Sequence, residues 1–206
     1  MSIQNRRERE KQEMRQKIFE AASQIILEQG YEKLSMRKIA EKIEYSPTIL
    51  YHYFTDKADI INQIILETYH NCVDKVKAEM ERNAYPDAGA QLRTGIKTFV
   101  HTLTANSQQF RAVLLSGGDM TIPDPDTSRE SSLDVMERML QKGVQEKVFH
   151  ALTPMTSQII IAAVFGLVFH IVGHGIDDYE TIESIADECA EILLLGLTIH
   201  KTGGQK

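Results

Sequence analysis

The chain has 206 residues, of which 42% are hydrophobic and 25% charged. These proportions are those of an ordinary globular protein and exclude a disordered, collagen-like or disulfide-scaffold chain. Aromatic residues make up 7% and Trp is absent, which favours helices over strands. Two cysteines, Cys72 and Cys189, are too few for a disulfide framework, so we expect a reduced, cytoplasmic protein.

The net charge of −6 is unevenly distributed along the chain. Residues 1–57 carry 11 basic and 9 acidic side chains, whereas the remainder carries 12 and 20. This asymmetry is compatible with an anionic partner at the N-terminal end only. Residues 1–17 lack the apolar run of a signal peptide, so export is not expected.

Apolar residues recur at the three- and four-residue intervals of helices along nearly the whole chain. Helix start signals support this pattern, because Ser35 can cap one helix, Ser46 before Pro47 begins another, and Thr55 or Asp56 can cap a further one. The sequence therefore predicts an all-α fold of about nine helices. They are expected near 14–29, 36–43, 47–54, 57–82, 92–103, 110–114, 133–148, 153–173 and 181–193, with an exposed loop at 120–129.

A stretch without Asp, Glu, Lys or Arg runs from Ala151 to Ile176. Its apolar centre, residues 159–172, is shorter than the ~20 residues of a membrane-spanning helix and contains Gly166 and His170. We therefore expect a buried or subunit-facing helix and no membrane.

The segment from Ser35 to Phe54 predicts two short helices joined by a tight turn, a helix-turn-helix. In that motif the first helix braces the second, whose N-terminal residues enter the major groove of DNA. Arg37, Lys38 and Lys57 stand at helix starts, where cations are unfavourable unless phosphates lie opposite. Any three-helix bundle contains such turns, so spacing alone leaves a purely structural role open.

The same segment closely resembles the DNA-binding signature of the TetR family of transcriptional regulators. The resemblance rests on LSMRKIAEKI at 34–43, YSPTILYHYF at 45–54 and DKADII at 56–61. Its most specific elements are the Ile-Ala pair, the Leu-Tyr-x-x-Phe run and the Lys three residues beyond it. One departure is Glu44, where many members have Gly in the turn, which leaves the turn geometry open.

The resemblance covers roughly residues 14–65 and implies a homodimer with two domains in each chain. These are a helix-turn-helix DNA-binding domain at 1–57 and a ligand-binding and dimerisation domain at 58–206. Carried over residue by residue, the resemblance implies DNA contacts from Ser35, Arg37, Ser46, Pro47, Thr48, Ile49, Tyr51, His52, Tyr53 and Lys57.

The last two helices are expected to form the homodimer interface as a four-helix bundle, because both carry more apolar surface than one chain of this size can cover. The candidate interface residues are Ile161, Phe165, Phe169, Ile192, Leu193 and Leu197. Alternatively, the other helices of the same chain cover these apolar faces.

A small apolar effector is expected to bind among the helices of the C-terminal domain and weaken DNA binding. Candidate lining residues are Phe99, Val100, Leu103, Phe110 and Met136, each of which could equally be plain core.

His170 and His174 are four residues apart on a predicted helix, a spacing that permits a shared metal, with Asp177, Asp178 and Cys189 nearby in sequence. Ile171 stands where a catalytic Glu of a metalloprotease would be, so core or interface histidines are the better interpretation. The acidic loop residues Asp119, Asp124 and Asp126 lack the central Gly and terminal Glu of a calcium loop.

The sequence thus predicts a ligand-responsive repressor that binds a palindromic operator as a dimer, with no cofactor and no catalytic activity. A ligand-blind helical DNA binder and a small metal-dependent enzyme using His170 and His174 remain as alternatives.

Overall fold

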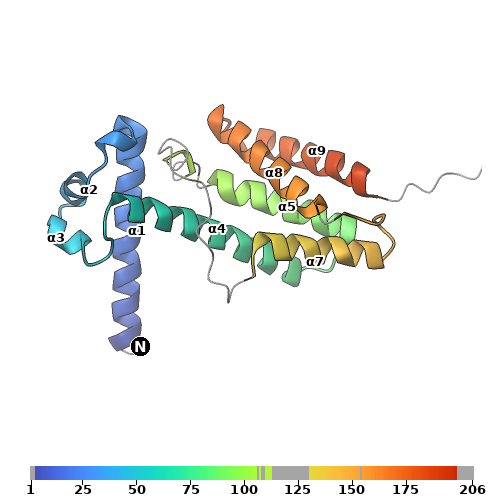
Figure 1. The fold of residues 1–206 in the computed structure, drawn as a ribbon, viewed down its shortest axis with the longest axis horizontal. Coiled ribbons are helices and arrows are strands. Elements are labelled where there is room, and N and C mark those ends of the chain that lie inside the picture. The colour runs from blue at the N-terminus through green and yellow to red at the C-terminus, as the bar shows by residue number, and fades with distance from the viewer. Residues whose placement is uncertain (1–2, 106, 108–109, 113–129, 154, 199–206) are drawn as a thin grey trace, which may run out of the picture. The chain divides into compact units, whose positions relative to one another are not determined.

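The computed structural model describes residues 3–105, 107, 110–112, 130–153 and 155–198, with side chains from residue 6 onward (Figure 1). The predicted all-α class is confirmed, since the pairing of Phe149 with Thr198 is the sole β-bridge among these residues. The helices are α1 (Ile3–Gln29), η1 (Tyr31–Lys33), α2 (Met36–Lys42), α3 (Pro47–Leu50), α4 (Lys57–Arg82), α5 (Ala88–Ala105), α7 (Ser132–Gln145), α8 (Thr156–Gly173) and α9 (Tyr179–Leu197). The expected loop at 120–129, with its three aspartates, and residues Val113, Leu114 and Pro154 lie outside the described part.

Two compact units divide the chain inside α4 rather than at its first residue. The N-terminal unit comprises residues 1–69 and 106–124, and the C-terminal unit comprises residues 70–105 and 125–206. The first turns of α4 belong to the N-terminal unit because Ile60, Ile61 and Ile64 are buried in its core. The domain boundary predicted from the sequence, 57/58, lies at the start of this shared helix.

The N-terminal unit is organised around one apolar cluster. Helix α1 contributes Ile18, Phe19 and Ile26, and the rings of Phe19 and Phe54 lie 5.4 Å apart between centroids. Arg15 packs its guanidinium over the Phe54 ring at 5.0 Å and donates a hydrogen bond to Gln63 on α4 at 2.8 Å. The cluster therefore ties α1 to α4 and to the end of the helix-turn-helix.

Helix α1 begins eleven residues before the predicted start at residue 14. The extension is rich in Arg, Lys, Glu and Gln, all good helix formers, and carries the i,i+4 ion pairs Arg6–Glu10 and Arg9–Glu13. Apolar periodicity cannot detect a helix segment that buries nothing, and residues 6–13 are all exposed. The prediction of the start was therefore wrong.

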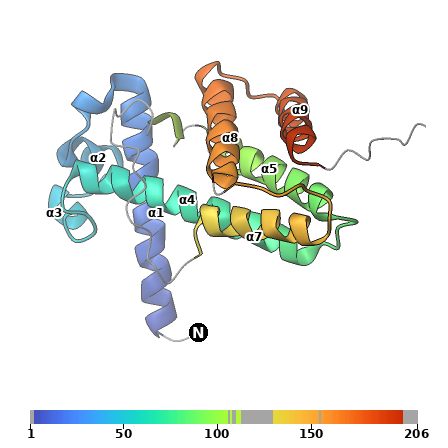
Figure 2. The same cartoon turned by 45° about the vertical axis from the view of Figure 1, so that its right-hand side comes forward.

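In the C-terminal unit, α5 packs against α7, α8 and α9 (Figure 2). The buried side of α5 presents Leu92, Ile96 and Val100, each at most 1% exposed. Helix α8 contributes Val164, Val168 and Ile171 to the same core. This arrangement makes α5 the central helix of the unit.

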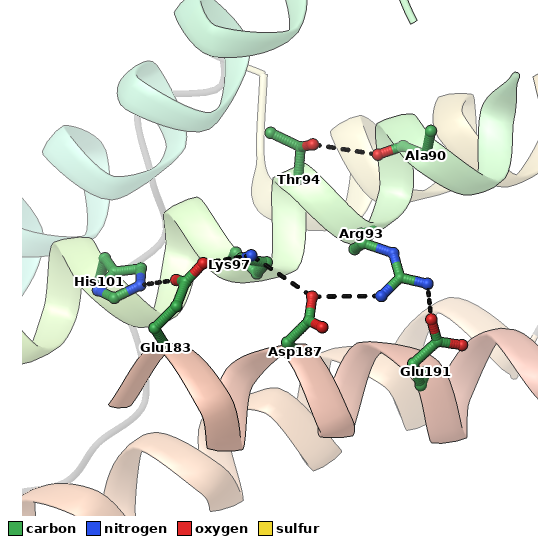
Figure 3. A network of polar contacts seen from close by, with 8 residues as sticks. All are labelled: Ala90, Arg93, Thr94, Lys97, His101, Glu183, Asp187 and Glu191. Carbon is green, nitrogen blue, oxygen red and sulfur yellow. Dashed lines mark hydrogen bonds and ion pairs between the residues drawn. The ribbon is translucent and has the colours of Figure 1, made fainter. Parts of the chain in front are cut away.

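A ladder of charged side chains joins α5 to α9 (Figure 3). Arg93 contacts Asp187 at 3.2 Å and pairs with Glu191, Lys97 pairs with Glu183, and His101 lies 2.6 Å from the other oxygen of Glu183. The ammonium of Lys97 lowers the pKa of Glu183, and the Arg93 guanidinium lowers that of Asp187. These partly exposed pairs fix the alignment of the two helices more than they stabilise them.

The end of α7 is shaped by a close contact between Gly143 and Phe149. After α7, Lys147 adopts a left-handed conformation with φ 59°, and the chain turns back on itself. The backbone N–H groups of Val148 and Phe149 both donate to the Gly143 carbonyl, at 2.9 and 3.0 Å. The Phe149 ring, 1% exposed, then lies directly on Gly143, which a side chain there would prevent.

Candidate nucleic-acid interface

The helix-turn-helix is formed by α2, a tight turn and α3. Ser35 caps α2 as predicted, with its hydroxyl accepting the backbone N–H of Lys38 at 3.3 Å. Pro47 occupies the first turn of α3, also as predicted, although Ser46 makes no side-chain cap bond. Asp56 caps α4 by accepting the N–H of Asp59 at 2.8 Å.

Helix α3 is shorter than predicted, ending at Leu50 rather than Phe54. The N–H groups of Tyr53 and Phe54 both donate to the Leu50 carbonyl, at 2.9 and 3.0 Å, so the chain tightens into a turn. Leu50 and Phe54 are buried as expected from the spacing. Their burial fixes the side of α3 that remains available to a partner.

The turn between α2 and α3 places Glu44 at φ 62°, the left-handed conformation that glycine adopts most easily. Tyr45 donates to the Ala40 carbonyl at 2.9 Å and Glu44 to that of Glu41 at 3.2 Å, the two hydrogen bonds of a Schellman C-cap. The turn therefore has the geometry that a glycine would give, although Glu44 stands at the position where many family members have Gly.

The stability of variants at Glu44 should depend on how easily the new residue adopts the left-handed conformation. We expect Glu44→Val to lower the free energy of unfolding by about 1 kcal/mol, because left-handed backbone is costly for a residue with a branched Cβ. Glu44→Gly should be at least as stable as the parent protein. Thermal or urea unfolding measures the order, and a Val variant as stable as the parent would contradict the assigned turn.

The predicted DNA contacts gather on one module, most of them exposed. Exposed side chains are Ser35, Arg37, Ser46, Pro47, Thr48, Tyr51 and His52; half-buried ones are Ile49, Tyr53 and Lys57. Tyr51 is the most prominent apolar group of the set, with 58% of its surface exposed. The arrangement offers hydroxyl, imidazole and phenol groups from one short helix and its following turn.

Lys57 has a local partner that the sequence did not reveal. Its ammonium lies 4.2 Å above the centre of the Tyr31 ring and 3.4 Å from the Tyr31 carbonyl oxygen. The cation is thereby held against η1. Lys38 is similarly engaged, at 2.6 Å from the Gln29 side chain, whereas Arg37 forms no ion pair with any described residue.

The residues predicted for the dimer interface divide by exposure. Ile192 is 61% exposed, Ile161, Phe165, Phe169 and Leu193 are half-buried, and Leu197 is buried within its own unit. Two further apolar residues of these helices, Ile159 at 63% and Leu195 at 59%, are also exposed. Because α8 is apolar on every side, sequence periodicity cannot separate its inner and outer faces.

By length and composition, Thr156–Gly173 is also the one described helix that could cross a membrane, with 33% of its residues buried. The core helices of other proteins have the same length and composition, so this helix alone does not indicate a membrane protein.

The residues predicted to line an effector site are only partly brought together. Phe99 and Met136 line an apolar pocket with a cavity volume of about 50 Å³, whereas Val100 and Leu103 are buried in the core outside it. Phe110 is buried and falls in the N-terminal unit. The remaining lining residues are Val73, Val76, Gly95, Ile96, Ser132, Val135, Met139, Ile161 and Val164.

The rings of His170 and His174 lie 4.2 Å apart, and His174 Nδ1 contacts the His170 carbonyl oxygen at 2.9 Å. Asp178 caps α9 by accepting the Thr181 N–H. Within the described part of the chain, no three His, Cys, Asp or Glu side chains gather as metal ligands. The geometry gives no support to a metal-dependent enzyme.

The fold and this module define a helix-turn-helix protein with a separate helical unit. The sequence model described as "Bacterial regulatory proteins, tetR family" matches residues 18–64, which span α1 to α4. The chain therefore carries the helix-turn-helix module of the tetR family, which confirms the resemblance seen in the sequence.

The chain resembles curated proteins over only part of its length. It is 33% identical over 72 residues to the HTH-type transcriptional regulator UidR of Escherichia coli, covering 35% of this chain and 37% of UidR. It is 25% identical over 101 residues to the HTH-type transcriptional activator FasR of Mycolicibacterium smegmatis, covering 49% and 45%. The matched regions thus span less than half the length of these relatives.

Solved structures share the fold over nearly the whole chain. The fatty acid degradation regulator FadR from Bacillus halodurans has a TM-score of 0.74 at 20% identity, covering 93% of this chain and 97% of FadR. The TetR family regulator PfmR from Thermus thermophilus has a TM-score of 0.69 at 21% identity, covering 88% and 99%.

Proposed function

We propose that the protein is a cytoplasmic transcriptional regulator that binds a palindromic DNA operator as a homodimer, represses transcription, and is released by a small apolar effector. The observation that carries the proposal is the α2–turn–α3 module, with its exposed polar residues and its match to the tetR family. A family of regulators is not an enzyme class, and no catalytic function is proposed.

DNA recognition is proposed to come from the N-terminal end of α3 and the turn after it. Thr48 and Tyr51 project from exposed positions, so a base edge or phosphate can reach them without unfolding the core. Arg37 stands exposed at the start of α2, where it can reach the phosphates beside the groove. Buried Leu50 and Phe54 hold these groups in place.

Dimerisation is proposed to use the exposed apolar faces of α8 and α9. On α8, Ile159, Ala163, Gly166 and His170 follow at i, i+4, i+7 and i+11 and are all exposed. Small residues in the middle of such a stripe allow close helix approach. Isologous pairing of these faces would make a four-helix bundle across a two-fold axis.

The effector is proposed to enter the pocket between α4, α5, α7 and α8 in the C-terminal unit. The pocket walls are apolar except for Ser132, so a hydrocarbon group fits them better than a charged one. Its volume of about 50 Å³ is far below the ~300 Å³ of a typical ligand site. Binding must therefore displace side chains such as Met136 and Met139, which gives the ligand a means of changing the conformation.

Fatty acids and their derivatives are the first effectors to test. The name of one structural neighbour, FadR, refers to fatty acid degradation, and another neighbour is a putative fatty acid metabolism regulator from Clostridium perfringens. The runner-up function, a ligand-blind DNA binder, would leave the pocket unused. Whether the protein represses or activates transcription must be tested separately, because the name of the relative FasR is that of an activator.

In vitro selection from random duplexes tests the proposal directly. Purified protein should enrich a sequence with two inverted half-sites, and Tyr51→Ala or Arg37→Ala should weaken binding to it by at least 10-fold. Glu137→Ala, an exposed substitution on α7, serves as the control and should leave affinity unchanged. Enrichment of no sequence would overturn the proposed function.

A side chain added at Gly95 should block the effector without affecting DNA binding. A Cβ there would lie 3.0 Å from the Met139 methyl group, inside the pocket. We expect Gly95→Val to bind operator normally and to lose its response to long-chain fatty acyl compounds. Thr94→Val, on the adjacent position outside the pocket, should keep that response. Equal responses from both variants would place the effector elsewhere.

A further inference from the structure

Among the described side chains of α1, those of residues 6–13 take no part in the packed core. The core cluster takes its first partly buried residue from α1 at Met14 and its first fully buried one at Ile18. Residues 6–13 are all exposed, and the family match itself begins at residue 18. In Figures 1 and 2, this N-terminal half of α1 continues past α3 with no other helix of its unit beside it.

Most of the acidic side chains on this segment are already paired with its own arginines. Four basic and three acidic side chains lie between Arg6 and Glu13, and the acidic Glu8 forms no ion pair with another described residue. Glu10 and Glu13 are occupied by i,i+4 pairs with Arg6 and Arg9. The acidic side chains that could neutralise the segment are thus mostly engaged by two of its own arginines.

Two cations remain on one stripe. Arg7 and Lys11 are exposed and form no ion pair with another described residue. They precede Met14 and Ile18 at i, i+4, i+7 and i+11, so all four share one side of the helix. Further along α1, that side packs into the core with α2 and α3. The two cations therefore lie on the side of α1 that, further along the helix, faces the core shared by α2, α3 and α4.

We propose that residues 3–13 form a basic arm whose Arg7 and Lys11 bind phosphates of the duplex next to each half-site. This inference rests on the proposed function and adds a contact surface outside α2 and α3. At a rise of 1.5 Å per residue, the eleven residues extend about 16 Å, which corresponds to about five base pairs. Continuity with the packed part of α1 keeps the arm helical, because no new nucleation is needed.

Salt dependence of operator binding tests the arm. The double variant Arg7→Gln/Lys11→Gln keeps good helix formers while removing both cations. Each lost phosphate contact should make the slope of log affinity against log salt less steep by about 0.9, or ~1.8 for each bound protomer. The loss should be equal on specific and scrambled duplexes, because phosphate contacts carry no sequence information.

Arg6→Gln/Arg9→Gln is the matched control, with the same change of net charge on the same three turns. Those arginines are paired with glutamates, so the slope should change by less than half as much. Equal slopes for the two double variants, or an unchanged slope for Arg7→Gln/Lys11→Gln, would overturn the arm while leaving the proposed function intact. A parent protein that binds no duplex would overturn both. Circular dichroism of all three proteins checks that the arm remains helical.

Discussion

Replacing Ile159 or Ile192 by Glu should convert the protein from dimer to monomer at micromolar concentration. Both side chains are more than 60% exposed within one chain, so the substitution costs little in the monomer. In the proposed four-helix bundle the new carboxylate would be buried against apolar residues, which costs several kcal/mol. Sedimentation or light scattering measures the change directly.

Loss of the dimer should also lower the affinity for the operator. Two linked recognition modules convert the second half-site contact into an intramolecular one, which raises affinity by about 10² to 10⁴. We expect both variants to bind a single half-site as well as the parent does, and the full palindrome at least 100-fold more weakly. Glu188→Gln, exposed on α9, is a control that should remain dimeric. Dimers that persist in both Glu variants would rule out this face.

Replacing Gly143 by Ala should lower the free energy of unfolding by about 2 kcal/mol. A Cβ there would lie well inside van der Waals contact with the Phe149 ring, and the ring is fully buried. Overpacking of this kind costs about 3 kcal/mol, and the better helix propensity of Ala returns about 1 kcal/mol. Urea unfolding measures the difference.

Two further variants separate the clash from an effect of the substitution itself. Gly196→Ala on α9, where a Cβ meets no heavy atom within 4 Å, should be neutral or stabilising. In a Phe149→Ala background the clash is absent, so adding Gly143→Ala should cost nothing. A full 2 kcal/mol loss in that background would show that the ring is not the cause.

Most helices could be predicted because their buried faces repeat at helical spacing. Helix α4 was predicted over its full length, since Ile60, Ile61 and Ile64 mark its inner face and Asp56 its cap. The extension of α1 escaped prediction because it is held by propensity and ion pairs alone. The early end of α3 escaped it too, because local hydrogen bonds to the Leu50 carbonyl decide that boundary.

The candidate DNA-binding module was located in the sequence because the motif is local. Ser35 and Pro47 occupy the predicted helix starts, and Tyr51 is exposed as expected for a contact residue. The pairing of Lys57 with Tyr31 joins residues 26 apart, and no spacing rule anticipates it. The apolar pocket depends on which faces of four helices meet, so the sequence could suggest its chemistry, but only two of the five candidate lining residues, Phe99 and Met136, line it.

Hydroxyl-radical footprinting of the selected duplex tests DNA binding by a two-fold dimer most directly. The account predicts two protected patches on one face of the duplex, about 34 Å apart and related by the symmetry of the palindrome, because two recognition modules occupy successive major grooves. The Ile159→Glu variant should protect each patch only at much higher concentration. A single asymmetric patch, or protection spread evenly along the duplex, would contradict the account.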